Sequence, residues 1–273
     1  MPSRPLVRLQ AFFDAHPRAV LVRVDAAKGS TPREAGAWML VSPAAILGTI
    51  GGGQMEFMAI DRARRILSGD AAEGSLDIPL GPEIGQCCGG RVRLDLRLAD
   101  ASIRLEIEDV ARGEAETRPT VFVFGAGHVG SALAAALLPL PVHVTVVETR
   151  DLVLDALPAG VAKMRAAVPE KAVRDAPGGS AFVVLTHDHA LDFLIVGEAL
   201  RRADAAYVGM IGSATKRETF RRWWLGEAAG DAAALAHLHC PLGGTTADKR
   251  PAVIAALTAA EIVTALAGSV PPG

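Results

Sequence analysis

A glycine-rich turn between an apolar run and a helical pattern constrains the fold of this 273-residue chain most. Residues 121–124 are valine and phenylalanine, which is typical of a buried strand, and the turn GAGHVG follows directly from Gly125 to Gly130. In this context Gly125 permits a tight turn, Gly127 lets a phosphate approach the backbone, and Gly130 lets the next helix pack closely. The sequence therefore predicts a Rossmann-type phosphate cradle.

An acidic residue closes the next expected strand, residues 142–147. Glu148 follows Gly125 by 23 positions, where the acid of such a fold hydrogen-bonds a ribose. His128 opens the helix after the turn, and the free N–H groups at such a helix start favour an anion. Arg150 could equally contact a phosphate, so these residues leave open whether the cradle holds a nucleotide, another phosphate or nothing.

The two halves of the chain show different patterns. The second half alternates strands with helices, which predicts a parallel sheet covered on both faces. The first half contains mostly short strand patterns, and the charged stretch Asp109–Pro119 between the halves has the composition of a linker. We predict an α/β protein with a smaller α+β N-terminal domain, residues 1–110, and a Rossmann-like C-terminal domain, residues 119–273.

Two adjacent cysteines, Cys87 and Cys88, lie between flexible residues in the motif GQCCGG. Thiolates are strong nucleophiles and soft metal ligands, so this loop is a candidate site for sulfur or metal chemistry. The third cysteine, Cys240, is remote, and the spacing of His237 and His239 before it matches no standard zinc pattern. The alternative is that the cysteine pair consists of small buried residues in a tight turn.

Polar residues also follow two later strands. The motif THDHALD begins after the strand that ends at Leu185, at an edge where open α/β sheets bind ligands. His187, Asp188 and His189 could act in acid–base chemistry or bind metal, or Asp188 could simply cap the next helix. After the following strand, Lys216 could neutralise an anion, but we expect it to be a solvated surface charge.

The overall composition excludes several classes of protein. The net charge is −2 and the pI is near 6.4, which argues against a nucleic-acid partner. Three cysteines are too few for a secreted disulfide framework. The N-terminus lacks a signal-peptide core, and the apolar stretch Pro251–Ala267 carries Glu261 and falls short of a membrane span. We expect a soluble, cytoplasmic protein that does not enter a membrane.

Taken together, these motifs resemble the XdhC/CoxI family of xanthine dehydrogenase accessory proteins, and the XdhC type more closely. Two positions depart from the usual family pattern: Cys240–Gly243 reads CPLG where CPIG is usual, and Glu148 stands where aspartate is common. The motifs that carry the resemblance span most of the chain in the family's order: GSTPREAGA (29–37), GTIGGGQME (48–56), GQCCGG (85–90), FGAGHVG (124–130), THDHALD (186–192) and YVGMIGSATKRETF (207–220).

The resemblance implies a chaperone rather than an enzyme. Such a protein binds molybdenum cofactor (molybdopterin), supports its sulfuration with sulfur from a cysteine desulfurase, and promotes its insertion into apo-xanthine dehydrogenase. Cys87 and Cys88 would then contact molybdenum transiently. The expected cofactor site is a cleft between the domains, lined by Gly51, Gly52, Gly53, Gln86, Cys87, Cys88, Gly125, Gly127, His128, Gly130, Glu148, His187, Asp188 and His189.

Other functions fit the same residues. An NAD(P)-dependent oxidoreductase could use the cradle for its nucleotide, with His187 or His189 as the acid. A scaffold could recruit the dehydrogenase without binding any cofactor. A homodimer is also expected, because the apolar C-terminal helix could pair with a second copy.

Overall fold

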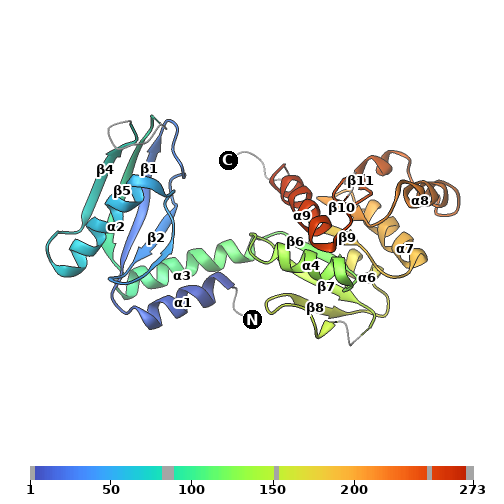
Figure 1. Ribbon diagram of the computed structural model, residues 1–273, viewed down its shortest axis with the longest axis horizontal. Helices are drawn as coiled ribbons and strands as arrows, with labels where there is room; N and C mark the ends of the chain where they lie inside the picture. Colours follow the sequence, from blue (N-terminus) through green and yellow to red (C-terminus); the bar gives the residue numbers. More distant parts are fainter. Residues whose placement is uncertain (1–3, 82–88, 151–153, 245–247, 269–273) are drawn as a thin grey trace. The chain divides into compact units, whose positions relative to one another are not determined.

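The computed structural model describes residues 4–81, 89–150, 154–244 and 248–268. The chain divides into two compact units, Met1–Glu116 and Thr117–Gly273, each with its own core (Figure 1). The predicted α/β class is confirmed, with an antiparallel sheet in the first unit and a parallel sheet in the second.

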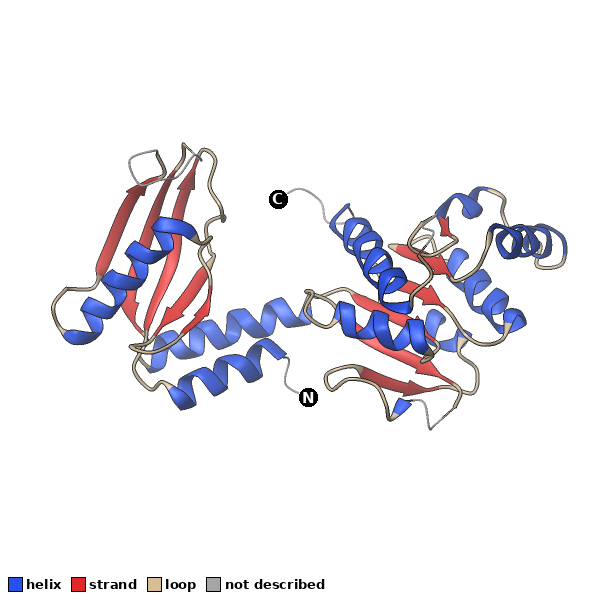
Figure 2. Ribbon diagram, viewed as in Figure 1, coloured by secondary structure: helices blue, strands red, loops and turns tan. Residues whose placement is uncertain are grey.

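The N-terminal domain is an antiparallel sheet with helices on both faces (Figure 2). Val20, Val22 and Val24 of the central strand pack with the helix α2, whereas Leu21 packs on the opposite face with α1 and α3. This alternation follows from the two-residue period of a strand. The sheet order is β3-β2-β1-β5-β4, and the elements are α1 (Arg4–Ala15), β1 (Val20–Lys28), β2 (Trp38–Val41), β3 (Ile46–Gly48), α2 (Gly53–Ser68), β4 (Gly74–Pro79), β5 (Arg91–Leu98) and α3 (Ala101–Glu116).

The stretch Asp109–Pro119, expected as a linker, is mostly helix. The helix α3 continues to Glu116, and Ile107, Ala111 and Ala115 are buried along one face of it. Apolar residues at every fourth position form a buried stripe, so the charges between them lie on the outer face. The boundary between the two units, after Glu116, does lie in this stretch. Most of the stretch is nevertheless helix, because the charges masked a helical repeat of small apolar residues.

The C-terminal domain is a six-stranded parallel sheet, which confirms the predicted Rossmann-type architecture. Val121 and Val123 face the side covered by α4 and α9, whereas Phe122 and Phe124 face the side covered by α6, α7 and α8. Strands buried on both faces account for the continuous apolar runs in the sequence. The sheet order is β11-β10-β9-β6-β7-β8, and the strands are β6 (Thr120–Phe124), β7 (His143–Glu148), β8 (Ala162–Arg165), β9 (Ala181–Val184), β10 (Tyr207–Met210) and β11 (Leu238–His239).

The order of this sheet brings the ends of β6 and β9 side by side. Strands β8 and β11 escape sequence analysis because all four residues of β8 are exposed and β11 has only two residues. The helices of the domain are α4 (His128–Leu137), α6 (Glu170–Arg174), α7 (His189–Leu200), α8 (Ala214–Gly226) and α9 (Pro251–Gly268), with a 3₁₀ turn, η2, at Ala233–His237.

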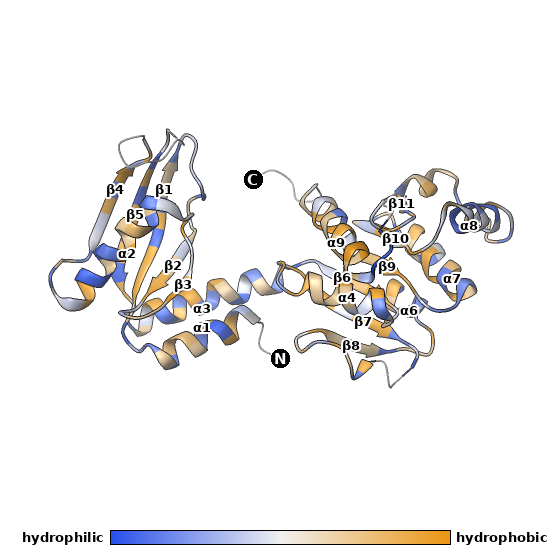
Figure 3. Ribbon diagram, in the orientation of Figure 1, coloured by the Kyte–Doolittle hydropathy of each residue, from blue (hydrophilic) through white to orange (hydrophobic). Residues whose placement is uncertain are grey.

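The helix α9 is long and apolar enough to cross a membrane by length and composition, contrary to the expectation from the sequence. Figure 3 shows much of it in the hydrophobic colours. Core helices of globular domains pass the same test, and Ala255, Ile262 and Leu266 are buried in the core that α9 shares with α4. In this structure α9 serves to cover one face of the sheet.

Candidate functional site

The cradle after β6 uses its three glycines in different ways. Gly125 has φ of 110°, and a Cβ there would lie 2.4 Å from the carbonyl oxygen of Leu185. A Cβ on Gly130 would lie 2.0 Å from the carbonyl oxygen of Gly125. Gly127 is the N-cap of α4, and a Cβ there would meet no described heavy atom within 4 Å. The first and third glycines are therefore required for packing, whereas the second faces open space that a ligand can enter.

Glu148, at the end of β7, is 4% exposed and is bonded within the chain. Its Oε2 accepts hydrogen bonds from Ala126 N (3.0 Å) and Arg150 Nη2 (3.0 Å), and its Oε1 accepts from Thr149 N (2.9 Å) and Arg150 Nε (3.2 Å). Burial opposes ionisation, but the hydrogen bonds from Arg150, Ala126 and Thr149 outweigh it and lower the pKa of Glu148 to about 2. This carboxylate ties the cradle to the end of β7.

The low pKa of Glu148 predicts a pH-dependent contribution to stability. A carboxyl whose folded pKa lies below its ordinary 4.5 stabilises the fold fully above about pH 4.5, and loses that contribution as the pH falls toward 2. We expect Glu148→Gln to lower the free energy of unfolding at neutral pH and to differ less from the wild type in acid. Denaturant titrations of both proteins between pH 7 and pH 2.5 measure this difference. A difference that stays constant with pH would contradict the assignment.

The motif THDHALD lies at the carboxyl end of β9, beside the cradle. Its His187 and His189 are exposed, and Asp188 caps α7 by accepting hydrogen bonds from Ala190 N (2.8 Å) and Leu191 N (3.4 Å). The capping role that the sequence left open is therefore present. The proposed acid–base and binding roles of these residues stay predictions.

A buried ion pair that sequence analysis missed joins this motif to α8, the helix after the next strand. Asp192 Oδ2 lies 2.5 Å from Lys216 Nζ, and the two side chains are 0% and 10% exposed. Asp192 Oδ1 also accepts hydrogen bonds from Thr186 N (2.9 Å) and Thr186 Oγ1 (2.7 Å). The pair thus orders the loop after β9 against the first turn of α8. Lys216 is therefore not the solvated surface charge that was expected.

The sequence indicates that Asp192 needs a partner, but it does not indicate which residue that partner is. Asp192 stands inside the apolar run ALDFLIV, where a charge is unexpected unless it is paired. Its partner lies 24 positions later, and only the adjacency of β9 and β10 brings the two together.

Cys240 follows β11 at the same carboxyl edge and is 4% exposed. Burial raises the pKa of its thiol and the nearby Asp192 adds to the rise, while the charges of Arg217 and Lys216 oppose it. Among the described residues, no group of three or more histidine, cysteine, aspartate or glutamate side chains could hold a metal ion.

Three loops of the N-terminal domain meet at one end of its sheet. Gly51 has φ of 126°, and a Cβ there would lie 2.6 Å from Pro32 Cγ. A Cβ on Gly90 would lie 2.3 Å from the carbonyl oxygen of Ser30. These contacts join the loop after β1 to the loop after β3 and to the base of the loop between β4 and β5. The predicted residues Gln86, Cys87 and Cys88 belong to this last loop and lie outside the described residues.

The glycine triplet is held by a carboxylate of the same chain. Glu56 Oε2 accepts hydrogen bonds from Thr49 Oγ1 (2.5 Å), Ile50 N (3.0 Å) and Gly52 N (3.1 Å). Burial opposes ionisation, yet these bonds lower the pKa of Glu56. The N–H groups of Ile50 and Gly52 are therefore already bonded, and the positive φ angles of Gly51, Gly52 and Gly53 serve this closed turn.

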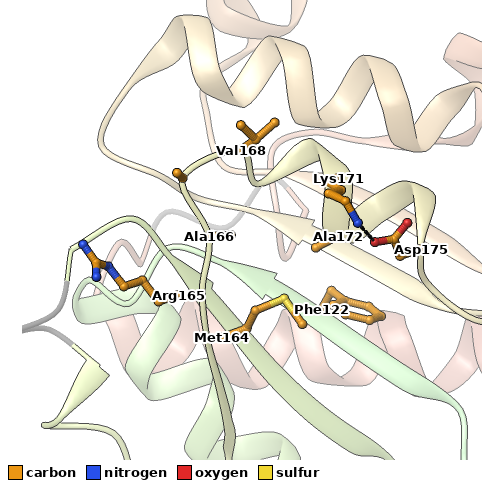
Figure 4. A pocket seen from close by; sticks show the side chains of 9 residues that line it. Phe122, Met164, Arg165, Ala166, Val168, Lys171, Ala172 and Asp175 are labelled. Atoms are coloured by element: carbon orange, nitrogen blue, oxygen red, sulfur yellow. Dashed lines mark hydrogen bonds and ion pairs between the residues drawn. The ribbon is translucent and has the colours of Figure 1, made fainter.

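Two surface hollows have linings that differ from the predicted site. One, of about 340 Å³, lies beside β8 and α6 and is lined by residues that include Phe122, Met164 and Val168 (Figure 4). The other, of about 730 Å³, lies over α2 and β4 beside Phe57, a phenylalanine that is 67% exposed. Neither described lining contains a residue that the sequence predicted to bind cofactor.

The two domains match two models of known protein families. Residues 121–262, somewhat more than half of the chain, match the XdhC Rossmann domain, and residues 13–76 match the XdhC and CoxI family. The chain belongs to the XdhC and CoxI family. The predicted resemblance is thereby confirmed.

One curated relative and one solved structure show how far the likeness extends. The uncharacterized protein YqeB of Escherichia coli (strain K12) is 28% identical over 251 residues, which cover 86% of this chain and 41% of YqeB. This XdhC-family chain thus spans about two fifths of the length of that relative. A crystal structure from Bacillus halodurans, described as a xanthine dehydrogenase, matches with a TM-score of 0.77 and 16% identity over 98% of this chain and 97% of the other. That match shows a shared fold.

Proposed function

We propose that this protein is an accessory factor for xanthine dehydrogenase, acting in maturation rather than as the catalyst. It binds molybdenum cofactor, supports sulfuration of the cofactor with sulfur from a cysteine desulfurase, and delivers it to the apo-dehydrogenase. The observation that carries this proposal is the match of both domains to XdhC family models, at residues 13–76 and 121–262.

The geometry of the cradle is compatible with this cargo. Molybdopterin carries a phosphate, and the open space at Gly127 beside the start of α4 suits an anion that approaches the backbone. The thiols of Cys87 and Cys88 are soft ligands, so they are the candidates to contact the molybdenum–sulfur centre. A carrier has to release what it carries, so this contact is proposed to be transient.

Gel filtration of the full chain after incubation with molybdopterin tests the proposal. We expect the cofactor to co-elute with the wild type, and replacement of both Cys87 and Cys88 by alanine to weaken retention about tenfold, which corresponds to about 1.4 kcal/mol. Cys240→Ala is the matched control, because that thiol is buried and its pKa is raised. Its retention should equal that of the wild type.

Two outcomes would contradict the proposal in different ways. If the wild-type protein elutes free of molybdopterin, the proposal that it binds the cofactor is contradicted, and the alternative of a scaffold that binds no cofactor remains. Retention that is unchanged in the double cysteine variant would remove the thiols from the site while leaving the carrier role in place.

A further inference from the structure

The acid of the cradle is covered by an arginine two residues further along the chain. Arg150 presents Nε to one oxygen of Glu148 (3.2 Å) and Nη2 to the other (3.0 Å), so the two side chains form a fork. The Glu148 side chain is 3% exposed and that of Arg150 is 48% exposed. The guanidinium therefore lies between the carboxylate and solvent.

The remaining acceptor positions of Glu148 are bonded to the backbone and to the Thr149 hydroxyl. Ala126 N donates to Oε2 (3.0 Å), and three groups donate to Oε1: Thr149 N (2.9 Å), Arg150 N (3.3 Å) and the hydroxyl Thr149 Oγ1 (3.2 Å). A carboxylate has about four lone-pair sites. These four donors and the two bonds of the Arg150 fork exceed that number, so no position remains for an incoming pair of hydroxyl groups. Without the fork, Oε2 would accept only from Ala126 N, so removal of the fork frees a position on that oxygen.

A bound dinucleotide needs those positions. In this fold the acid at the end of the second strand accepts hydrogen bonds from a ribose hydroxyl. Here a ribose diol would have to displace a charge-assisted, two-point ion pair, which is among the stronger hydrogen-bonded arrangements in proteins. The amides near Gly127 are unaffected by this closure, because a Cβ at that position would still meet open space.

We propose that Arg150 is a specificity-determining residue that closes the cradle to ligands presenting a ribose diol. The cradle then takes a phosphate ester that lacks one. This second part rests on the proposed function, since it identifies the cargo as the form of the cofactor that carries no attached nucleotide.

Calorimetric titration of the full chain with NADH tests the role of Arg150. We expect no saturable binding to the wild type and binding about tenfold tighter or more in Arg150→Leu, because the freed carboxylate gains a charged hydrogen bond to the ribose. The gain should vanish with the 2′-deoxyadenosine analogue of NADH. Thermal unfolding checks that the variant is folded, and Arg150→Lys, which keeps the charge but cannot form the fork, is the second variant.

Arg250→Leu is the matched control. Arg250 forms a fork of the same sequence spacing with Asp248, through Nε (2.9 Å) and Nη2 (2.5 Å) to the same carboxylate oxygen, and its side chain is 78% exposed. Cutting this pair should leave NADH binding as in the wild type.

Several results would overturn the inference. These are tight NADH binding by the wild type, no gain in either Arg150 variant, and a gain that persists with the 2′-deoxy analogue. Wild-type binding of NADPH that Arg150→Leu abolishes would instead assign the guanidinium to a 2′-phosphate. A chain that binds NADH and still retains molybdopterin would remove this inference alone. A chain that binds neither ligand would remove the proposed function and the identity of the cargo, and would leave the role of Arg150 in place.

Discussion

Replacing Asp192 by alanine should lower the free energy of unfolding of the C-terminal domain by about 3–5 kcal/mol. The reason is the ammonium of Lys216, which is 10% exposed and would stay buried without its partner. The loop N–H of Thr186 would lose its acceptor at the same time. Denaturant unfolding followed by tryptophan fluorescence measures the effect, because Trp223 and Trp224 both lie on α8 of this domain.

Two further variants separate a buried charge from a general loss of packing. Replacing Asp192 by leucine together with Lys216 by methionine should cost less than Asp192→Ala alone, because no unpaired charge remains. Asp175→Ala breaks the exposed pair with Lys171 and should change stability by about 0–1 kcal/mol. An Asp192→Ala protein as stable as Asp175→Ala would show that the pair is not buried.

Gly130→Ala should destabilise the same domain by about 3 kcal/mol or more. The added Cβ would lie 2.0 Å from the carbonyl oxygen of Gly125 and 2.8 Å from Leu185 Cδ1. The nearer of these atoms belongs to the backbone, so rotation of a side chain cannot relieve the overlap and α4 has to move away from the sheet. The same fluorescence-detected unfolding measures the loss.

Gly127→Ala is the control for this substitution. Gly127 has φ of −68°, and its Cβ would meet no described heavy atom within 4 Å. Alanine is a poorer N-cap than glycine, which destabilises the fold, but it also restricts the unfolded chain, which stabilises the fold. The change in the free energy of unfolding should therefore stay within about 1 kcal/mol. Equal losses in the two variants would contradict the different roles assigned to these glycines.

The strands and helices of the C-terminal domain were largely predictable because their signals are local. The run 121–124, the glycines of the turn and the acid at Glu148 lie within one strand–helix–strand unit, where spacing along the chain carries the geometry. The helix α3 was missed for the opposite reason. Its buried face consists partly of alanines, such as Ala111 and Ala115, whose weak hydrophobicity was outweighed by the charges between them.

The hydrogen bonds that the candidate residues form were not predictable in the same way. Glu148 was recognised as the acid beside a glycine turn, but its bonding to the chain's own amides and to Arg150, like that of Glu56 to the glycine triplet, depends on side-chain directions. The meeting of three N-terminal loops likewise depends on which strands are neighbours in the sheet.

The family, the parallel sheet of the C-terminal domain and the position of its glycine-rich cradle were predictable from the sequence, because each is encoded in contiguous motifs. Only the tertiary structure decided that Asp192 and Lys216 form a buried pair and that an arginine covers the acid of the cradle. A buried charge needs partners that offset its desolvation. Such partners lie far away in the sequence, as Lys216 on α8 does, or depend on the directions of individual side chains, as Arg150 does.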